Sequence, residues 1–217
     1  MTNPTPSHSF SGQRAWLATL LAATLALNSG CAALLLGGAV GTALTASDRR
    51  STGTQIEDQL IELKARNRTR EVLPDSGNVS LTSYNRVLLL TGEVPTDTNR
   101  TALEASVSKI DGVKSVVNEL IVRDASTFSS RSSDTVVTTK VKATFAESRA
   151  FPINAVKIVT ERGVVYLMGR VTEAEGNQAA ELARGVGGVM KVVKVFEPIS
   201  QSEIDALKPA PEPAPAS

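Results

Sequence analysis

The sequence predicts an α+β protein in which one small α-β-β-α-β domain occurs twice in tandem. Three observations support this prediction. The stretch VSLTSYNRVLLLTGEV, which begins at Val79, aligns without a gap with VKIVTERGVVYLMGRV, which begins at Val156. A Gly-Val step and a valine-rich strand follow each stretch, at Gly112 and at Gly188. The period near 77 residues indicates a duplicated domain and is too long for a solenoid repeat.

The composition is that of a globular protein without an obvious catalytic centre. The 23 Lys and Arg residues balance the 22 Asp and Glu residues, so we expect no nucleic-acid partner. His8 is the only histidine and Cys31 the only cysteine, and both lie near the N-terminus. The remaining chain therefore lacks the usual nucleophile pairs and the usual zinc and copper ligands. We expect no enzyme activity, no cofactor and no metal ion, with carboxylate-only catalysis as the remaining alternative.

Residues 1–30 have the plan of a bacterial signal peptide. Arg14 precedes an apolar run of about 13 residues, from Ala15 to Leu27, and the small residues Ser29 and Gly30 follow it. This run is shorter than the ~20 residues that a transmembrane helix needs. Cys31 comes next, as in a bacterial lipobox, although the leucine lies one place further from the cysteine than usual. We expect Cys31 to be lipidated with palmitate among its acyl chains, and to become the new N-terminus.

Residues 31–50 form a second segment, which is apolar and rich in glycine and alanine until it ends at Asp48-Arg49-Arg50. We expect this segment to lie at the membrane surface beside the lipid anchor. The alternative is that residues 15–46 cross the membrane as one interrupted helix, which Asn28 and the glycines disfavour. By resemblance to enterobacterial lipoproteins, Ala32 after the cysteine indicates the outer membrane rather than the inner one.

The first domain is expected over residues 51–124 and begins with a helix. Thr54 to Glu57 has the pattern of a capping box. Ile56, Leu60 and Leu63 recur at helical spacing. They predict a helix over residues 54 to about 70 with this apolar face toward the core.

The rest of the first domain is predicted to be two strands, a helix and a third strand. Alternation from Val79 and the apolar run 86–91 predict a hairpin that turns at Tyr84-Asn85 and is closed by Gly92. Leu103, Val107 and Ile110 mark a second helix, Gly112 has the place of its C-cap, and residues 113–122 form the third strand. Because a helix connects the last two strands, they should run parallel, while the hairpin is antiparallel. Each domain is therefore predicted to be a mixed three-stranded sheet with two helices on one face.

The second domain, expected over residues 134–200, repeats this order. Its first helix is predicted from Val137, Val141 and Phe145, and its second from Ala179, Leu182 and Val186. Residues 156–160 and 164–168 form the hairpin, and residues 189–196 the last strand. Domains of ~70 residues have small cores, so we expect the two copies to pack together.

Two further segments are predicted to lie outside the domains. Residues 125–133 are polar and serine-rich, which favours a linker. Residues 201–217 end in KPAPEPAPAS, which favours a Pro-rich disordered tail.

Five stretches carry a resemblance to a known family: DRRSTGTQIED at Asp48, VLLLTGEV at Val87, DGVKSVVNEL at Asp111, SDTVVTTKVKATF at Ser133 and VYLMGRVTEAE at Val165. With them the chain resembles the BON-domain family, in particular the outer-membrane lipoproteins with two BON domains. The resemblance implies a periplasm-facing protein that binds an anionic phospholipid membrane through its second domain and supports envelope integrity. The alternative is an adaptor that binds an envelope protein and touches the membrane only through its lipid anchor.

The resemblance places the lipid-binding element on the first helix of the second domain. If Val137 faces the core, Val136 points about 100° away and shares an outer face with Lys140 and Ala143. Thr135, Lys142 and Phe145 are further candidates. A valine beside a lysine suits the headgroup boundary of a bilayer, although the residues alone favour an ordinary surface valine. Related lipoproteins carry tryptophan, a better interfacial anchor, where this chain has Val136.

Overall fold

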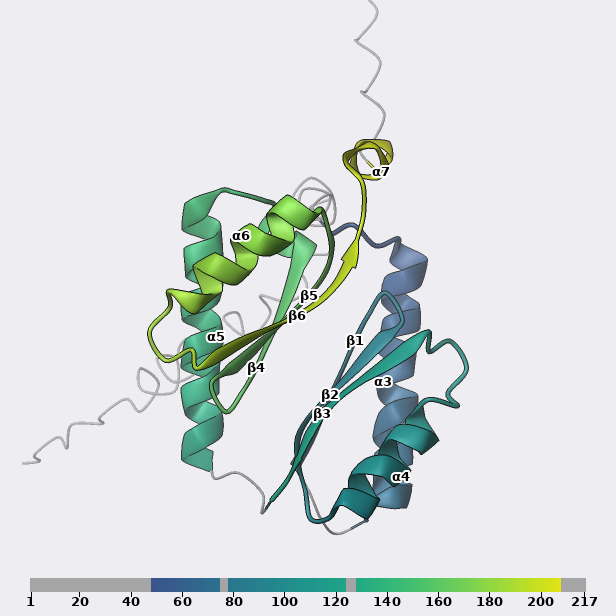
Figure 1. Cartoon of the computed structure of the whole chain (residues 1–217). Coiled ribbons are helices and arrows are strands. Elements are labelled where there is room, and N and C mark those ends of the chain that lie inside the picture. The colour runs from purple at the N-terminus through teal and green to yellow at the C-terminus, as the bar shows by residue number, and fades with distance from the viewer. Residues whose placement is uncertain (1–47, 75–77, 124–127, 208–217) are drawn as a thin grey trace, which may run out of the picture. The chain divides into compact units, whose positions relative to one another are not determined.

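The computed structural model describes residues 48–74, 78–123 and 128–207, which lie within one compact unit, Ala46–Ser217 (Figure 1). The expected signal peptide, Cys31 and the end of the Pro-rich tail lie outside the described residues. The described part contains two α-β-β-α-β domains and a short terminal helix. The predicted fold class is therefore confirmed.

The first domain has the predicted mixed sheet. Its elements are α3 (Thr52–Val72), β1 (Asn78–Tyr84), β2 (Val87–Val94), α4 (Asp97–Val107) and β3 (Ser115–Val122). Strand β2 is central, antiparallel to β1 and parallel to β3. Helix α4 is the connection that makes the parallel pair possible.

The second domain repeats this topology. Its elements are α5 (Phe128–Ser148), the short 3-10 helix η3 (Ile153–Ala155), β4 (Val156–Glu161), β5 (Val164–Val171), α6 (Glu173–Arg184) and β6 (Lys191–Pro198), and α7 (Gln201–Ala206) follows it. Strand β5 is central, antiparallel to β4 and parallel to β6.

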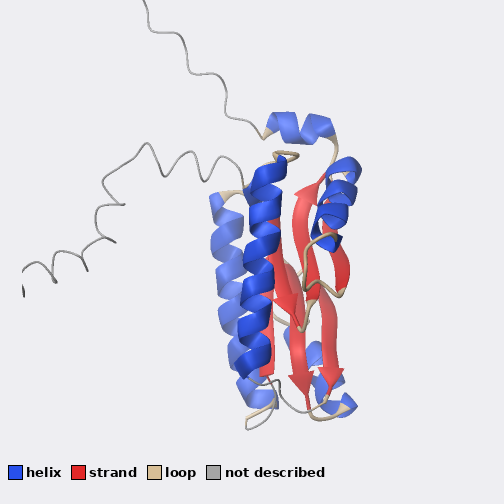
Figure 2. Cartoon of the chain, turned by 90° about the vertical axis from the view of Figure 1, so that its left-hand side faces the viewer, coloured by secondary structure: helices blue, strands red, loops and turns tan. Residues whose placement is uncertain are grey.

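The central strands are buried on both faces. Leu88 and Leu90 of β2 belong to the core that the first domain forms with its helices, whereas Leu89 belongs to a cluster with Tyr166 and Met168 of β5. Alternate side chains of a strand point to opposite faces, so one face of each sheet packs against helices and the other against the second sheet (Figures 1 and 2). This double burial explains the nearly continuous apolar runs of both strands.

A buried aspartate on the first helix of each domain binds the hairpin turn. Asp58 accepts hydrogen bonds from the backbone N–H groups of Asn85 and Arg86, both at 2.8 Å. Asp134 accepts the equivalent bonds from Arg162 and Gly163, also at 2.8 Å. These bonds fix the rotation of α3 and α5 about their axes, because each carboxylate must face its turn.

The first hairpin turns one residue later than predicted. Asn85 and Arg86 are the two turn residues, with φ of 49° and 69°. Two consecutive positive φ values are the geometry of a type I′ turn, which matches the twist of the strands it joins. Tyr84 therefore stays in β1 and is buried.

The predicted core face of α3 is wrong. Ile56, Leu60 and Leu63 are 54%, 49% and 53% exposed, whereas Ile61 and Ala65 are buried. The aspartate bond at Asp58 turns the helix so that the apolar row points away from the sheet. The capping prediction is also wrong, because the N-cap is Ser51, whose side chain accepts from the Thr54 N–H at 3.1 Å.

Other boundaries differ by a few residues. Helix α4 ends at Val107, and Gly112, with φ of 96°, lies in the following turn and not at the C-cap. Helix α5 begins at Phe128 and α7 covers Gln201–Ala206, so helices extend into the segments expected as linker and tail. Within the described ranges, no helix combines the length and the apolar character that a membrane crossing requires.

Candidate functional site

The outer face of α5 carries five of the six residues predicted to bind lipid. Val136 is 53% exposed, and Lys140 lies one turn further along the helix and is exposed. Thr135, Lys142 and Ala143 are exposed as well. The helix period places Val136, Lys140 and Ala143 on one side of α5, whereas Lys142 is exposed about 120° further around the helix.

The packing of α5 explains why Val136 points outward. Val137 and Val141 lie in the core of the second domain, 5% and 0% exposed. Thr138 donates a hydrogen bond to Thr160 of β4 at 2.7 Å. Together with the Asp134 bonds to the hairpin turn, these contacts leave Val136 on the far side of the helix.

Phe145 is not part of this surface. Its ring is 1% exposed and packs against Phe151 in a T-shaped arrangement, with centroids 5.1 Å apart. The spacing of Val137, Val141 and Phe145 already predicts a common inward face, which excludes direct contact between Phe145 and a ligand at the helix surface. The inclusion of Phe145 among the lipid-binding candidates is therefore corrected.

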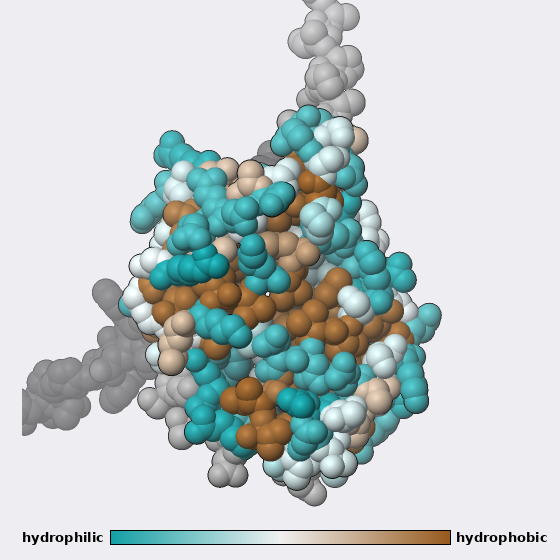
Figure 3. All heavy atoms as spheres, in the orientation of Figure 1, coloured by the Kyte–Doolittle hydropathy of each residue, from teal (hydrophilic) through white to brown (hydrophobic). Residues whose placement is uncertain are grey.

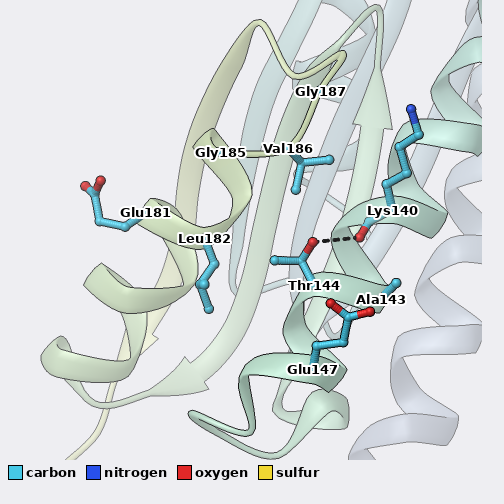
Figure 4. A pocket seen from close by; sticks show the side chains of 9 residues that line it. All are labelled: Lys140, Ala143, Thr144, Glu147, Glu181, Leu182, Gly185, Val186 and Gly187. Atoms are coloured by element: carbon cyan, nitrogen blue, oxygen red, sulfur yellow. Dashed lines mark hydrogen bonds between the residues drawn. The ribbon is translucent and has the colours of Figure 1, made fainter.

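A hollow of about 660 Å³ adjoins the predicted surface, between α5 and the C-terminal end of α6. Figure 4 shows Lys140, Ala143, Thr144 and Glu147 on the α5 side and Leu182 and Val186 opposite them. Gly185 and Gly187 complete the lining. The apolar spacing of the sequence does not reveal this hollow, because it predicts Leu182 and Val186 only as helix core. Both are half-buried, so they offer apolar surface in the hollow that Lys140 also lines.

The charges around the hollow are mixed. Lys140 of α5 lines it, while Glu147 and Glu181 contribute carboxylates, and Glu181 pairs with Arg184. Among the residues that the structure describes, no group of three or more acidic, histidine or cysteine side chains could hold a metal ion. The hollow therefore offers apolar contact beside one lysine and two carboxylates.

The junction between the two sheets is polar at its ends. Arg49, before α3, donates two hydrogen bonds to Glu175 at the start of α6, at 2.7 and 2.6 Å. These bonds lower the pKa of Glu175. At the hairpin of the second domain, burial and the neighbouring carboxylates of Glu93 and Asp134 raise the pKa of Glu161 to about 7.

A second hollow of about 410 Å³ lies between the sheets, lined by residues of β1, β2, β3, β5 and β6 and by Asn85 of the first hairpin turn. Figure 3 shows apolar residues gathered across the middle of this face, over the strands. Val117, Val193 and Val195 belong to the cluster that joins the sheets and line this hollow. We assign it to the packing of the domains.

Comparison with protein families gives one match that covers both domains. The model described as "BON domain" matches residues 57–124 and again residues 133–197. The two matches coincide with the two α-β-β-α-β domains of the structure.

Three curated relatives share most of their length with this chain. Outer membrane lipoprotein DolP of Haemophilus influenzae is 38% identical over 183 residues, which are 83% of this chain and 94% of that protein. A 21 kDa hemolysin of Actinobacillus pleuropneumoniae is 32% identical over 69% of this chain and 78% of its own length. Osmotically-inducible protein Y of Escherichia coli is 29% identical over 67% of this chain and 75% of its own length.

Proposed function

This chain belongs to the BON-domain family, as an outer-membrane lipoprotein with two BON domains, and from that premise we propose that its second domain binds anionic phospholipid. The lipid surface is the outer face of α5. The protein faces the periplasm, held by acyl chains on Cys31, has no catalytic role, and supports the integrity of the outer membrane.

The observation that carries this proposal is the exposure of Val136 beside Lys140 and Ala143, with Lys142 exposed further around the same helix. An exposed apolar side chain enters the acyl region, while ammonium groups one or two turns away meet phosphates. The adjoining hollow adds the half-buried Leu182 and Val186 next to Lys140. One valine is a small anchor, so binding is expected to depend on the negative charge of the lipid.

Flotation with vesicles tests the lipid specificity. The polypeptide of residues 46–217 contains all three clusters of buried residues and lacks the acylated cysteine. It should float with phosphatidylglycerol vesicles and remain behind with phosphatidylcholine vesicles. The double substitution Val136→Asp and Lys140→Glu should lower recovery with phosphatidylglycerol by roughly threefold to tenfold, because it removes apolar contact and reverses one charge.

The matched control is Ala102→Asp, at an exposed position of α4. It should leave flotation unchanged. Equal flotation with both lipids would remove the claim of anionic specificity, and an unchanged double variant would remove α5 from the site. In cells, the α5 variant should fail to restore detergent resistance to a deletion strain, whereas the Ala102→Asp chain should restore it.

A further inference from the structure

Helix α3 carries a row of apolar side chains that no described element covers. Ile56, Leu60 and Leu63 are each about half exposed. At 100° per residue, the three side chains fall within about 60° of one another, almost opposite the buried face of Asp58, Ile61 and Ala65. The row is therefore the outermost surface of the helix and cannot reach the core of its own domain.

The duplication places this row where α5 has its candidate lipid surface. Asp58 and Asp134 make the same bonds to their hairpins and so align the two helices. In this alignment Leu60 corresponds to Val136 and Lys64 to Lys140.

The first domain offers the larger apolar surface at these positions. Ile56 and Leu63 correspond to Ser132 and Thr139 of α5, so α3 has three large apolar side chains where α5 has one. The same helix position is thus more apolar in the domain to which the family resemblance assigns no lipid site.

Cationic side chains flank the apolar row. The C-terminal half of α3 carries Lys64, Arg66, Arg68 and Arg70, all exposed. Arg66 pairs with Glu62 at 3.4 Å and Arg68 with Glu71 at 2.9 Å, while Glu62 also pairs with Lys157 at 3.2 Å. Exposed pairs of this kind are weak, so their cations can exchange a carboxylate for a phosphate. Long cationic side chains beside an apolar row can extend toward phosphates while the row enters the acyl boundary.

The position of α3 in the chain also favours a membrane. It is the first described helix after the expected anchor, and about 20 residues separate Cys31 from its N-cap Ser51. A short tether to the bilayer raises the local concentration of lipid at α3. The row also lies on the convex surface of a single helix. It therefore does not form the apolar groove that a bound peptide helix requires.

We propose that the outer face of α3 is a second bilayer-binding surface, which inserts Ile56, Leu60 and Leu63 into a membrane that contains anionic phospholipid. This rests on the proposed membrane anchoring of the chain but not on the α5 site. The helix lies in the plane of the interface, with its flanking lysine and arginines at headgroup level.

Tryptophan fluorescence in the full chain tests this surface directly. Trp16 is the only tryptophan and lies in the expected signal peptide, so the mature chain that begins at Cys31 is a background without indole emission. Into it we would introduce Leu60→Trp, Val136→Trp or, as control, Ala102→Trp on α4, and reconstitute each acylated protein in vesicles of phosphatidylethanolamine and phosphatidylglycerol with brominated acyl chains. Emission from position 60 should be at least about twofold more quenched than emission from position 102, because only a buried indole contacts bromine.

A second variant shows whether the apolar row of α3 or the introduced indole itself drives insertion into the bilayer. Ile56→Gln and Leu63→Gln, added to Leu60→Trp, should return quenching to the level of position 102. Quenching that persists, or that is absent from Leu60→Trp, would overturn the proposal, as would equal quenching in vesicles of phosphatidylcholine alone. The result at position 136 is separate: its failure would remove the α5 site and leave the α3 surface in place.

Discussion

The two domains share their backbone contacts and differ in the side chains around them. Each has a buried aspartate that accepts two hydrogen bonds from the hairpin turn, and each has a glycine with positive φ before its last strand, Gly112 at 96° and Gly188 at 102°. The aspartates satisfy the N–H groups of the turn, and the glycines adopt a positive φ that other residues rarely adopt. The two copies therefore have the same residue where the backbone requires a specific one.

The cores of the two domains are filled differently. The first is aliphatic, with Leu88, Leu90 and Leu103 fully buried, whereas the second contains the aromatic pair Phe145 and Phe151. Cores tolerate such exchanges when total volume is kept. The outer faces of α3 and α5 differ most, because neither packing nor hydrogen bonding constrains them.

The largest expected difference in stability between the two domains comes from the buried aspartates. Asp58→Ala should reduce the free energy of unfolding by about 4 kcal/mol, since it leaves two turn N–H groups and the Ser83 hydroxyl without their acceptor and removes one of the two carboxylates that pair with Arg50. Asp134→Ala should cost about 2 kcal/mol, because its described bonds are to backbone N–H groups alone. Urea unfolding measures both.

The surface control for these variants is Asp111→Ala, an exposed carboxylate, which should change stability by less than about 0.5 kcal/mol. Equal losses for Asp58→Ala and Asp134→Ala would mean that Arg50 and the Ser83 hydroxyl add nothing to the first aspartate. Losses as small as that of Asp111→Ala would show that the turn N–H groups find other partners.

The glycines of the central strands should show a smaller difference between the domains. Gly92 has φ of 108°, and an added Cβ would lie 1.9 Å from the Asn78 carbonyl oxygen. Gly169, its counterpart, has no such φ, and its Cβ would lie 2.5 Å from the Ala155 oxygen. We expect Gly92→Ala to cost about 3 kcal/mol and Gly169→Ala about 1.5 kcal/mol, measured by thermal and urea unfolding. A larger loss at Gly169 would show that the close contact matters more than the backbone angle.

Much of the fold was predictable because each domain repeats the other. The gapless alignment from Val79 and Val156 locates both hairpins, and the apolar spacing of Val137, Val141 and Phe145 identifies the inward face of α5 correctly. The same reasoning failed for α3, because its most regular apolar row, at Ile56, Leu60 and Leu63, is the exposed one. Periodicity finds an apolar face but cannot say whether that face is toward the core or toward another surface.

The candidate site was predictable only in part. Exposure of Val136 and Lys140 follows from the helix period once the inward face is known. The hollow beside them was not predictable, because it depends on how closely α6 approaches α5 around Gly185 and Gly187. The orientation of α3 likewise depends on Asp58, whose turn partners lie 27 and 28 residues further along the chain.

The smallest expected effect comes from the residue before each turn, Tyr84 in the first domain and Glu161 in the second. Burial raises the pKa of Tyr84 to about 12, so this side chain stays neutral between pH 5 and 8. Burial and the neighbouring Glu93 and Asp134 raise the pKa of Glu161 from 4.5 to about 7. Because the folded state binds this proton more tightly than the unfolded state, its stabilising contribution is complete below pH ~4.5 and is lost as pH rises through ~7.

Glu161→Gln should remove this loss and leave the first domain unaffected. After allowance for partial solvent exposure, it should raise the free energy of unfolding by about 1 to 2 kcal/mol at pH 8 and change it little at pH 4. Urea unfolding at both pH values measures the difference, and Glu147→Gln on the exposed face of α5 should show none. Destabilisation by Glu161→Gln at pH 8 would contradict this expectation. It would mean that the nearby Arg162 stabilises the Glu161 carboxylate by more than burial destabilises it, so that the second hairpin depends on this charge.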